Sequence, residues 1–129
     1  MENESISEIF KLVPGDLNHV DFHQAVSSIQ RLVPEKFPLH LAVHSVLVED
    51  KNPPKVYSAP HMHTDQDEVN ILISKSSMVY NIMLDDEEHE VAAPATIWIP
   101  AGKAHSANVV SGEGFFICIR FEKGPVSHE

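Results

Sequence analysis

From about Leu39 onward, apolar and polar residues alternate with a period of two, in short runs separated by turn-forming residues. The runs cover residues 39–49, 55–63, 68–74, 78–84, 89–92, 96–99, 105–110 and 115–122. Such alternation is typical of strands, and the breaks between the runs are rich in Gly, Pro, Asp and Ser. About eight short strands without intervening helices predict an all-β fold, either an antiparallel sandwich or a closed jelly-roll barrel.

Two helices are predicted before the strands. Ser5 and Glu8 have the spacing of a capping box, and apolar residues then recur at helical intervals until Pro14. A second helix is expected from Asp21 to Pro34, with an apolar stripe formed by Phe22, Ala25, Val26, Ile29, Leu32 and Val33.

We therefore expect residues 1–38 to form a helical extension packed outside a barrel of residues 39–129, as one structural domain overall.

Charge and cysteine content narrow the possible partners. The chain has 129 residues and a formal net charge of −10, which argues against nucleic acid and anionic membranes as partners. No apolar run approaches the roughly 18 residues of a membrane span. The one cysteine, Cys118, lies inside an apolar run, so an intrachain disulfide is impossible and a cytoplasmic location is expected.

One group of residues has the composition of a metal site. His61 and His63 are two residues apart, so a strand would present both imidazoles on one face. Glu68 begins the next strand, and His105 follows a Pro100-x-Gly102 turn. Three imidazoles and one carboxylate suit a divalent transition metal and leave a position for water or substrate. Asp67 is an alternative to Glu68; glutamate reaches further and is favoured.

These spacings resemble the two motifs of the cupin superfamily. His61, His63 and Glu68 match the metal ligands of its first motif, and Pro100, Gly102 and His105 match the core of its second. The resemblance covers roughly residues 39–122 and implies a double-stranded β-helix barrel with the metal in its mouth. Two glycines of the first motif are replaced, by Lys55 and Lys75. Asn108 lies three residues after His105 instead of four, so it is not assigned to the site.

Strand parity extends the candidate site. If His61 and His63 face a cavity, so does Tyr57, and if Glu68 faces it, so does Asn70. We therefore predict Tyr57 and Asn70 as catalytic or substrate-contacting groups. The alternatives are a half-buried strand tyrosine and a core asparagine bonded to the backbone.

The same alternation predicts that some side chains point out of the barrel and leaves the direction of others open. Val69, Ile71 and Ile73 would form an apolar outer face that needs cover, from the N-terminal helices or from a second subunit, and we expect a homodimer. His40 and His44 share a strand face, and one of them could enter the cavity as a base, although a surface location is favoured. Arg120 could hold a substrate carboxylate; a solvent-facing arginine paired with an acid is the commoner arrangement.

The predicted function follows from the metal. Iron, manganese, nickel, cobalt and zinc all accept this ligand set. The resemblance implies a metal-dependent enzyme acting on a small molecule that chelates the metal through oxygen atoms, as a dioxygenase, an isomerase or a lyase. The alternative is a non-catalytic cupin that binds or senses a small ligand. The sequence does not identify the substrate, the metal or the type of reaction.

Overall fold

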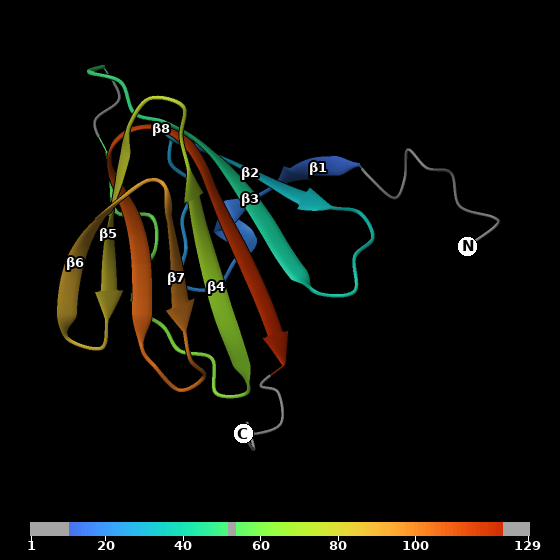
Figure 1. Ribbon diagram of the computed structural model, residues 1–129. Coiled ribbons are helices and arrows are strands. Elements are labelled where there is room, and N and C mark those ends of the chain that lie inside the picture. Colours follow the sequence, from blue (N-terminus) through green and yellow to red (C-terminus); the bar gives the residue numbers. More distant parts are fainter. Residues whose placement is uncertain (1–10, 52–53, 123–129) are drawn as a thin grey trace.

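The computed structural model describes residues 11–51 and 54–122, which form eight strands and one short 3₁₀ helix (Figure 1). The elements are β1 Leu12–Gly15, η1 Leu17–His19, β2 Ile29–Pro34, β3 His40–Leu47, β4 Gln66–Ile73, β5 Met78–Leu84, β6 Glu87–Ala92, β7 Ala95–Ile99 and β8 His105–Glu122. All pairings between strands are antiparallel, in the order β1-β2-β3-β8-β4-β7, and β5 pairs with both β6 and β8. The all-β expectation is confirmed.

The long strand β8 belongs to both layers of the fold. Its first part pairs with β5, and its second part lies between β3 and β4 (Figure 1). Gly112 lies where the strand leaves β5; its φ is 90°, and a Cβ there would collide with the backbone of Ser77. The sequence pattern predicted a turn at Ser111–Gly114, but glycine lets the strand continue through this region.

The core lies between the inward faces of the two layers. On β4 the buried side chains alternate, as Glu68, Asn70 and Leu72, because successive strand residues point to opposite faces. On β5 the buried residues facing them include Tyr80 and Ile82. The polar end of this interior, at Glu68, is where the candidate site lies.

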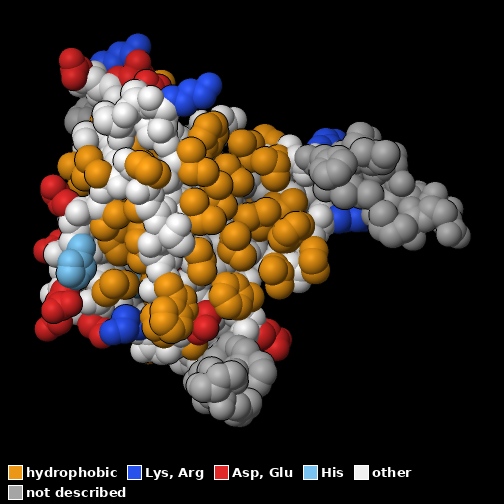
Figure 2. All heavy atoms as spheres, in the orientation of Figure 1, with side chains coloured by type: hydrophobic (Ala, Val, Ile, Leu, Met, Phe, Trp, Pro, Cys, Tyr) orange, Lys and Arg blue, Asp and Glu red, His pale blue; other side chains and the backbone are white. Residues whose placement is uncertain are grey.

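The opposite face of the main sheet carries many apolar side chains that are exposed or partly exposed. We call it the outer sheet face, and it comprises Leu41, Val43, Val69, Ile71, Ile73, Trp98, Phe115, Ile117, Ile119 and Phe121. Cross-strand pairs such as Val69 with Trp98 and Ile73 with Phe115 build it up. Hydrophobic side chains gather over β3, β4 and β8 in Figure 2. The outward direction predicted for Val69, Ile71 and Ile73 agrees with this arrangement.

The two N-terminal helices are not supported. The first expected helix lies largely outside the described residues, and its end, from Leu12, is extended in β1. The second is wrong: Ile29–Pro34 is strand β2, which pairs with β1 and β3. Hydrogen bonding to β3 outweighs the helical spacing of the apolar residues, and Phe22, with a φ of 66°, is incompatible with a helix. The only helical turn in the described part is η1, capped by Asp16.

Two further expectations concern the chain's organisation. Residues 55–63 were expected to form a strand, but among the described ones only isolated bridges occur, at Ser58 and His61. The division of the chain at residue 38 stays a prediction. Among the described residues, no helix has the length and apolar character needed to cross a membrane.

Candidate metal centre

The backbones of His61 and His105 hold each other in register. The N–H of His61 donates to the carbonyl of His105 at 2.9 Å, and the N–H of His105 donates to the carbonyl of His61 at 2.8 Å. This isolated antiparallel bridge joins the coil before β4 to the first residue of β8. Two imidazoles from segments far apart in the sequence are thereby placed side by side.

The Pro100–Gly102 turn positions His63. Gly102, with a φ of 86°, donates its N–H to the carbonyl of His63 at 2.7 Å, and Asp67 Oδ1 accepts from the N–H of Ala101 at 2.8 Å. Glycine suits this turn because its φ is positive. The proline-glycine turn thus fixes the backbone of one histidine and leads into the strand that carries another.

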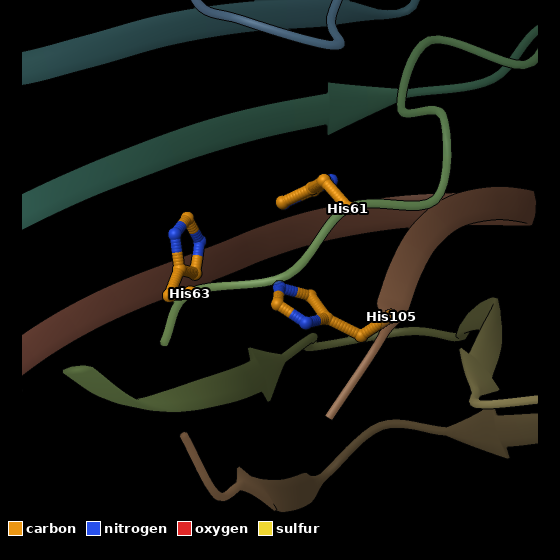
Figure 3. A group of neighbouring side chains, drawn as sticks. All are labelled: His61, His63 and His105. Atoms are coloured by element: carbon orange, nitrogen blue, oxygen red, sulfur yellow. The ribbon is translucent and has the colours of Figure 1, made fainter. Parts of the chain in front are cut away.

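Three imidazoles converge on one space. A ring nitrogen from each of His61, His63 and His105 lies within 4.8 Å of the others, and the rings face a common region in Figure 3. Nδ1 of His61 donates to the carbonyl of Ala59 at 2.7 Å, and Nδ1 of His105 donates to the carbonyl of Lys103 at 3.0 Å. Such bonds leave Nε2 of each ring as the nitrogen with a free lone pair.

The buried Nε2 of His105 lies 3.3 Å from Oε1 of Glu68, but it has no well-aligned hydrogen bond among the described residues. Because Nδ1 of this ring donates to the carbonyl of Lys103, Nε2 carries a lone pair, and a buried lone pair that faces a carboxylate is suited to a positively charged partner. A divalent metal among three neutral imidazoles would provide that partner. The residues present therefore fit a divalent transition metal.

Glu68 borders this cluster. Its Oε1 lies 3.4 Å from Nε2 of His63 and 3.3 Å from Nε2 of His105, and its Oε2 accepts from Nδ2 of Asn70 at 2.8 Å. Burial raises the pKa of Glu68, but His105, Asn70 and His63 outweigh that effect and hold the pKa at about 2. Glu68 is therefore a carboxylate at neutral pH, the form that binds a metal.

The pKa values of the three histidines respond differently to their surroundings. Burial lowers the pKa of His61, and burial together with Arg120 lowers the pKa of His63 to about 4. Burial also acts to lower the pKa of His105, but its contact with Glu68 raises that pKa on balance. His61 and His63 are thus held in the neutral form that a metal requires.

The other predicted site residues lie apart from the histidine cluster. Asp67 holds the Pro100–Gly102 turn, so its carboxylate is engaged elsewhere. Asn70 is completely buried behind Glu68 and does not line the cavity. Tyr57 contributes to the cavity wall, but its hydroxyl donates to Tyr80 at 2.9 Å. Burial raises the pKa of Tyr57 well above its usual value, so this hydroxyl stays protonated.

Asn108 lies outside the cluster, in agreement with the sequence prediction. Its Oδ1 accepts from the N–H groups of Tyr57 and Ser58, at 2.8 and 2.9 Å, and its Nδ2 donates to the carbonyl of Ser58 at 2.9 Å. These three bonds tie the coil before His61 to β8. Asn108 therefore positions the segment that carries two of the histidines.

His61, His63 and His105 line a cavity of about 520 Å³, a size typical of small-molecule sites. His40, His44 and Arg120 line it, although a surface location was favoured for these histidines and a solvent-facing one for the arginine. Their inward direction follows from strand parity, since they share a face with buried Ala42 and Phe116. Burial, with Arg120, lowers the pKa of His40 to about 4, and burial, with Arg31, lowers that of His44 to about 3.

Phe22, His23 and Arg31 line the cavity but were not predicted to do so from the sequence. The Phe22 ring stacks on His61 with centroids 5.6 Å apart and planes 4° apart, and His23 approaches His61 edge-on at 5.2 Å. All three lie in the region predicted to be helical. Recognising β2 as a strand paired with β3 would have identified Arg31, because it lies opposite His44.

Comparison with solved structures identifies the architecture. An RmlC-like cupin from Shewanella frigidimarina has a TM-score of 0.55 and 13% identity, covering 95% of this chain and 93% of that chain. KdgF from a Halomonas species has a TM-score of 0.59 and 16% identity, covering 83% and 92%. A predicted oxalate decarboxylase from Thermotoga maritima has a TM-score of 0.61 and 10% identity, covering 89% and 96%.

These likenesses define the fold: the chain has the barrel fold of the cupin superfamily, as its histidine motifs predicted. No protein-family model matches the sequence, and no curated protein matches it. The function therefore has to be argued from the site itself.

Proposed function

We propose that this protein is a metal-dependent enzyme that acts on a small molecule. His61, His63, Glu68 and His105 would hold a divalent transition metal, and the substrate would chelate it through oxygen atoms. The observation that carries the proposal is the convergence of three imidazole nitrogens within 4.8 Å, next to a deprotonated carboxylate. Backbone carbonyls orient two of the three rings, as is common for histidines that bind metals.

The residues have separable roles. The imidazoles and Glu68 would hold the metal, and Asn70 fixes the Glu68 carboxylate, as partners of metal ligands do. When bound, the metal would polarise substrate oxygen atoms and stabilise negative charge that develops on them. Tyr57 would contact the substrate as part of the cavity wall, with a hydroxyl that remains protonated.

The reaction is proposed to be that of a lyase, an isomerase or a dioxygenase. The name of the Thermotoga maritima neighbour, a predicted oxalate decarboxylase, supports the first of these, because decarboxylation is a lyase reaction. Iron, manganese, nickel, cobalt and zinc all suit the donor set. Iron would favour dioxygenase chemistry, and the other metals would favour lysis or isomerisation.

Metal depletion and reloading test this function. Protein purified without chelators is screened for turnover of small oxygen-rich molecules, with oxygen consumption recorded in parallel. Chelation should abolish turnover, and the metal found in the native protein should restore it. Turnover that survives complete depletion would contradict the proposal, whereas tight ligand binding without any product would favour a binding module instead.

We also propose that two copies associate through the outer sheet face. Its members include Trp98, which is 63% exposed, and Phe115 and Ile73, which are 46% and 47% exposed. The ten apolar residues lie together over β3, β4, β7 and β8, so two copies can bury apolar surface against each other there, despite a net charge of −10 each. A second copy presents the same apolar face, and association would bury both faces. Because the one cysteine, Cys118, is free, we propose the cytoplasm as the location.

A further inference from the structure

The cavity contains two arginines beside the proposed metal centre, Arg31 on β2 and Arg120 on β8. Among residues 11–51 and 54–122, neither forms an ion pair with a carboxylate. A partly buried guanidinium usually has such a partner, because an unpaired charge away from water is costly. Neither guanidinium therefore has a carboxylate within ion-pair distance in this part of the chain.

The hydrogen bonds of both guanidiniums go to imidazoles. Arg120 donates from Nη1 to Nδ1 of His63 at 3.2 Å and from Nη2 to Nδ1 of His40 at 2.9 Å. Arg31 donates from Nη1 to Nε2 of His44 at 3.2 Å. An imidazole carries no negative charge, so these contacts orient the guanidiniums without neutralising them.

Both arginines act on the same part of the cavity. Arg120 lies between Glu68 and His40 in the strand register, and Arg31 lies opposite His44 on the neighbouring strand. After burial, the charge of Arg120 is one of the causes that lower the pKa of Arg31, so the two guanidiniums are close enough to repel each other. An anion placed between them would relieve that repulsion.

The other charged groups of the cavity do not supply this anion. Glu68 is bonded to Asn70 and borders His63 and His105. Asp21 is exposed at the rim. A divalent metal would add two further positive charges, which makes the interior attractive to an anion in a protein that is acidic overall.

Metal binding would also change what Arg120 does. A neutral imidazole has one unprotonated nitrogen, and both a metal and an arginine donor need that lone pair. His63 therefore cannot accept from Arg120 with the same lone pair that it gives to a metal. Occupation of the metal centre would release Nη1 of Arg120 for another acceptor, next to the metal.

We propose that Arg31 and Arg120 bind the carboxylate of a small anionic substrate whose other oxygen atoms reach the metal centre. This inference rests on the proposed function, since it names the substrate class of the same site. A planar carboxylate matches the fork of guanidinium donors better than a neutral group does.

Binding of malonate to the metal-free protein tests the anion site, with malonamide as the neutral analogue and inorganic phosphate as a different anion. Calorimetry should show that malonate binds more tightly than phosphate and that malonamide does not bind. R120Q and R31Q should each weaken malonate binding by about tenfold or more, because each loses a charged hydrogen-bond donor. K75Q, which removes an exposed charge in the turn after β4, should change it less than about twofold.

Equal binding of malonate and malonamide, or unchanged malonate binding in folded R120Q and R31Q, would overturn the inference. Tighter binding of phosphate would overturn the assignment to a carboxylate. Zn²⁺ titrations distinguish failure of the anion site from failure of the proposed metal centre. H61A should lose Zn²⁺ affinity and still bind malonate, whereas R120Q should bind Zn²⁺ and lose affinity for malonate. Failure of the wild-type protein to bind Zn²⁺ or another divalent metal would count against the metal centre alone.

Discussion

Asn70 and Glu68 form a buried hydrogen bond of 2.8 Å, from Nδ2 of the amide to Oε2 of the carboxylate. Both side chains point inward from β4, two residues apart, and Asn70 is fully buried. The amide therefore holds one carboxylate oxygen while the other faces His63 and His105. Asn70 is a positioning residue in this arrangement.

Replacing Asn70 by Ala should weaken Zn²⁺ binding by about 10- to 100-fold, because the carboxylate loses the partner that orients it. The matched control is N81A, since Asn81 donates to the exposed Glu88 at 3.0 Å and lies outside the cavity. Competition titrations with a chelator give both affinities. An N70A affinity equal to that of N81A would show that the bond does not position Glu68.

Acid should destabilise the protein as the buried histidines become protonated. His44 is buried against Tyr57 and Phe116, and its Nε2 accepts from Arg31. Because burial lowers its folded-state pKa to about 3, the unfolded chain binds the proton first, near 6.5. The contribution of His44 to stability is thus complete above pH 6.5 and is lost as the pH falls toward 3.

The H44Q variant should therefore lose stability less steeply between pH 6.5 and 4, by up to about 1.4 kcal/mol per pH unit. His40 and His63 act in the same direction, and His105 acts in the opposite one because its pKa is raised. Urea unfolding at several pH values measures the slope, with H89Q on the exposed part of β6 as the control. Identical slopes in H44Q and the wild type would count against a neutral buried His44.

Gly112 and Gly102 provide a matched pair for testing the path of β8. Their φ values are 90° and 86°, so alanine is strained to a similar degree at both. A Cβ at Gly102 meets nothing within 4 Å, whereas a Cβ at Gly112 collides with the Ser77 backbone. G102A should cost about 1 kcal/mol of unfolding free energy, and G112A about 2–4 kcal/mol. Equal losses would mean that β8 does not pass this close to Ser77.

Association through the outer sheet face can be disrupted by one charge. Phe115 pairs with Ile73 and is 46% exposed, so F115E places a carboxylate within the apolar contact. Sedimentation velocity should show a dimer for the wild type and a monomer for F115E. The V56E variant, altered at a residue that is 64% exposed outside this face, should remain a dimer. A wild-type monomer at micromolar concentration would contradict the proposed dimer.

The sequence predicted the strands that show regular alternation and the site residues that belong to spaced motifs. Strand β5, at Met78–Leu84, agrees with its apolar run, and the two histidine motifs led to the residues that now lie together. Such local patterns do not show which distant segments pair with each other as strands. The register of β2 with β3 decides that Arg31 is a strand residue opposite His44, and the apolar spacing around Arg31 instead suggested a helix.

The inward direction of Arg120 and His40 was available from strand parity, but general frequencies favoured a solvent-facing position. In the structure, Arg120 lies in register with His40 on one side and Glu68 on the other, so all three face the interior. Polar residues that share a parity with buried neighbours are therefore candidates for the cavity. An inward direction does not always lead to the cavity, because Asn70 points inward and lies in the core behind Glu68.

The most direct test of this account is the metal content of the protein purified without chelators. Elemental analysis should give about one divalent transition metal per chain for the wild type and for the control H89A. The variants H61A, H63A and H105A should each lose metal on dialysis, with affinities reduced by more than about 100-fold. A folded wild-type protein that contains no metal and binds none of iron, manganese, nickel, cobalt or zinc would contradict the account.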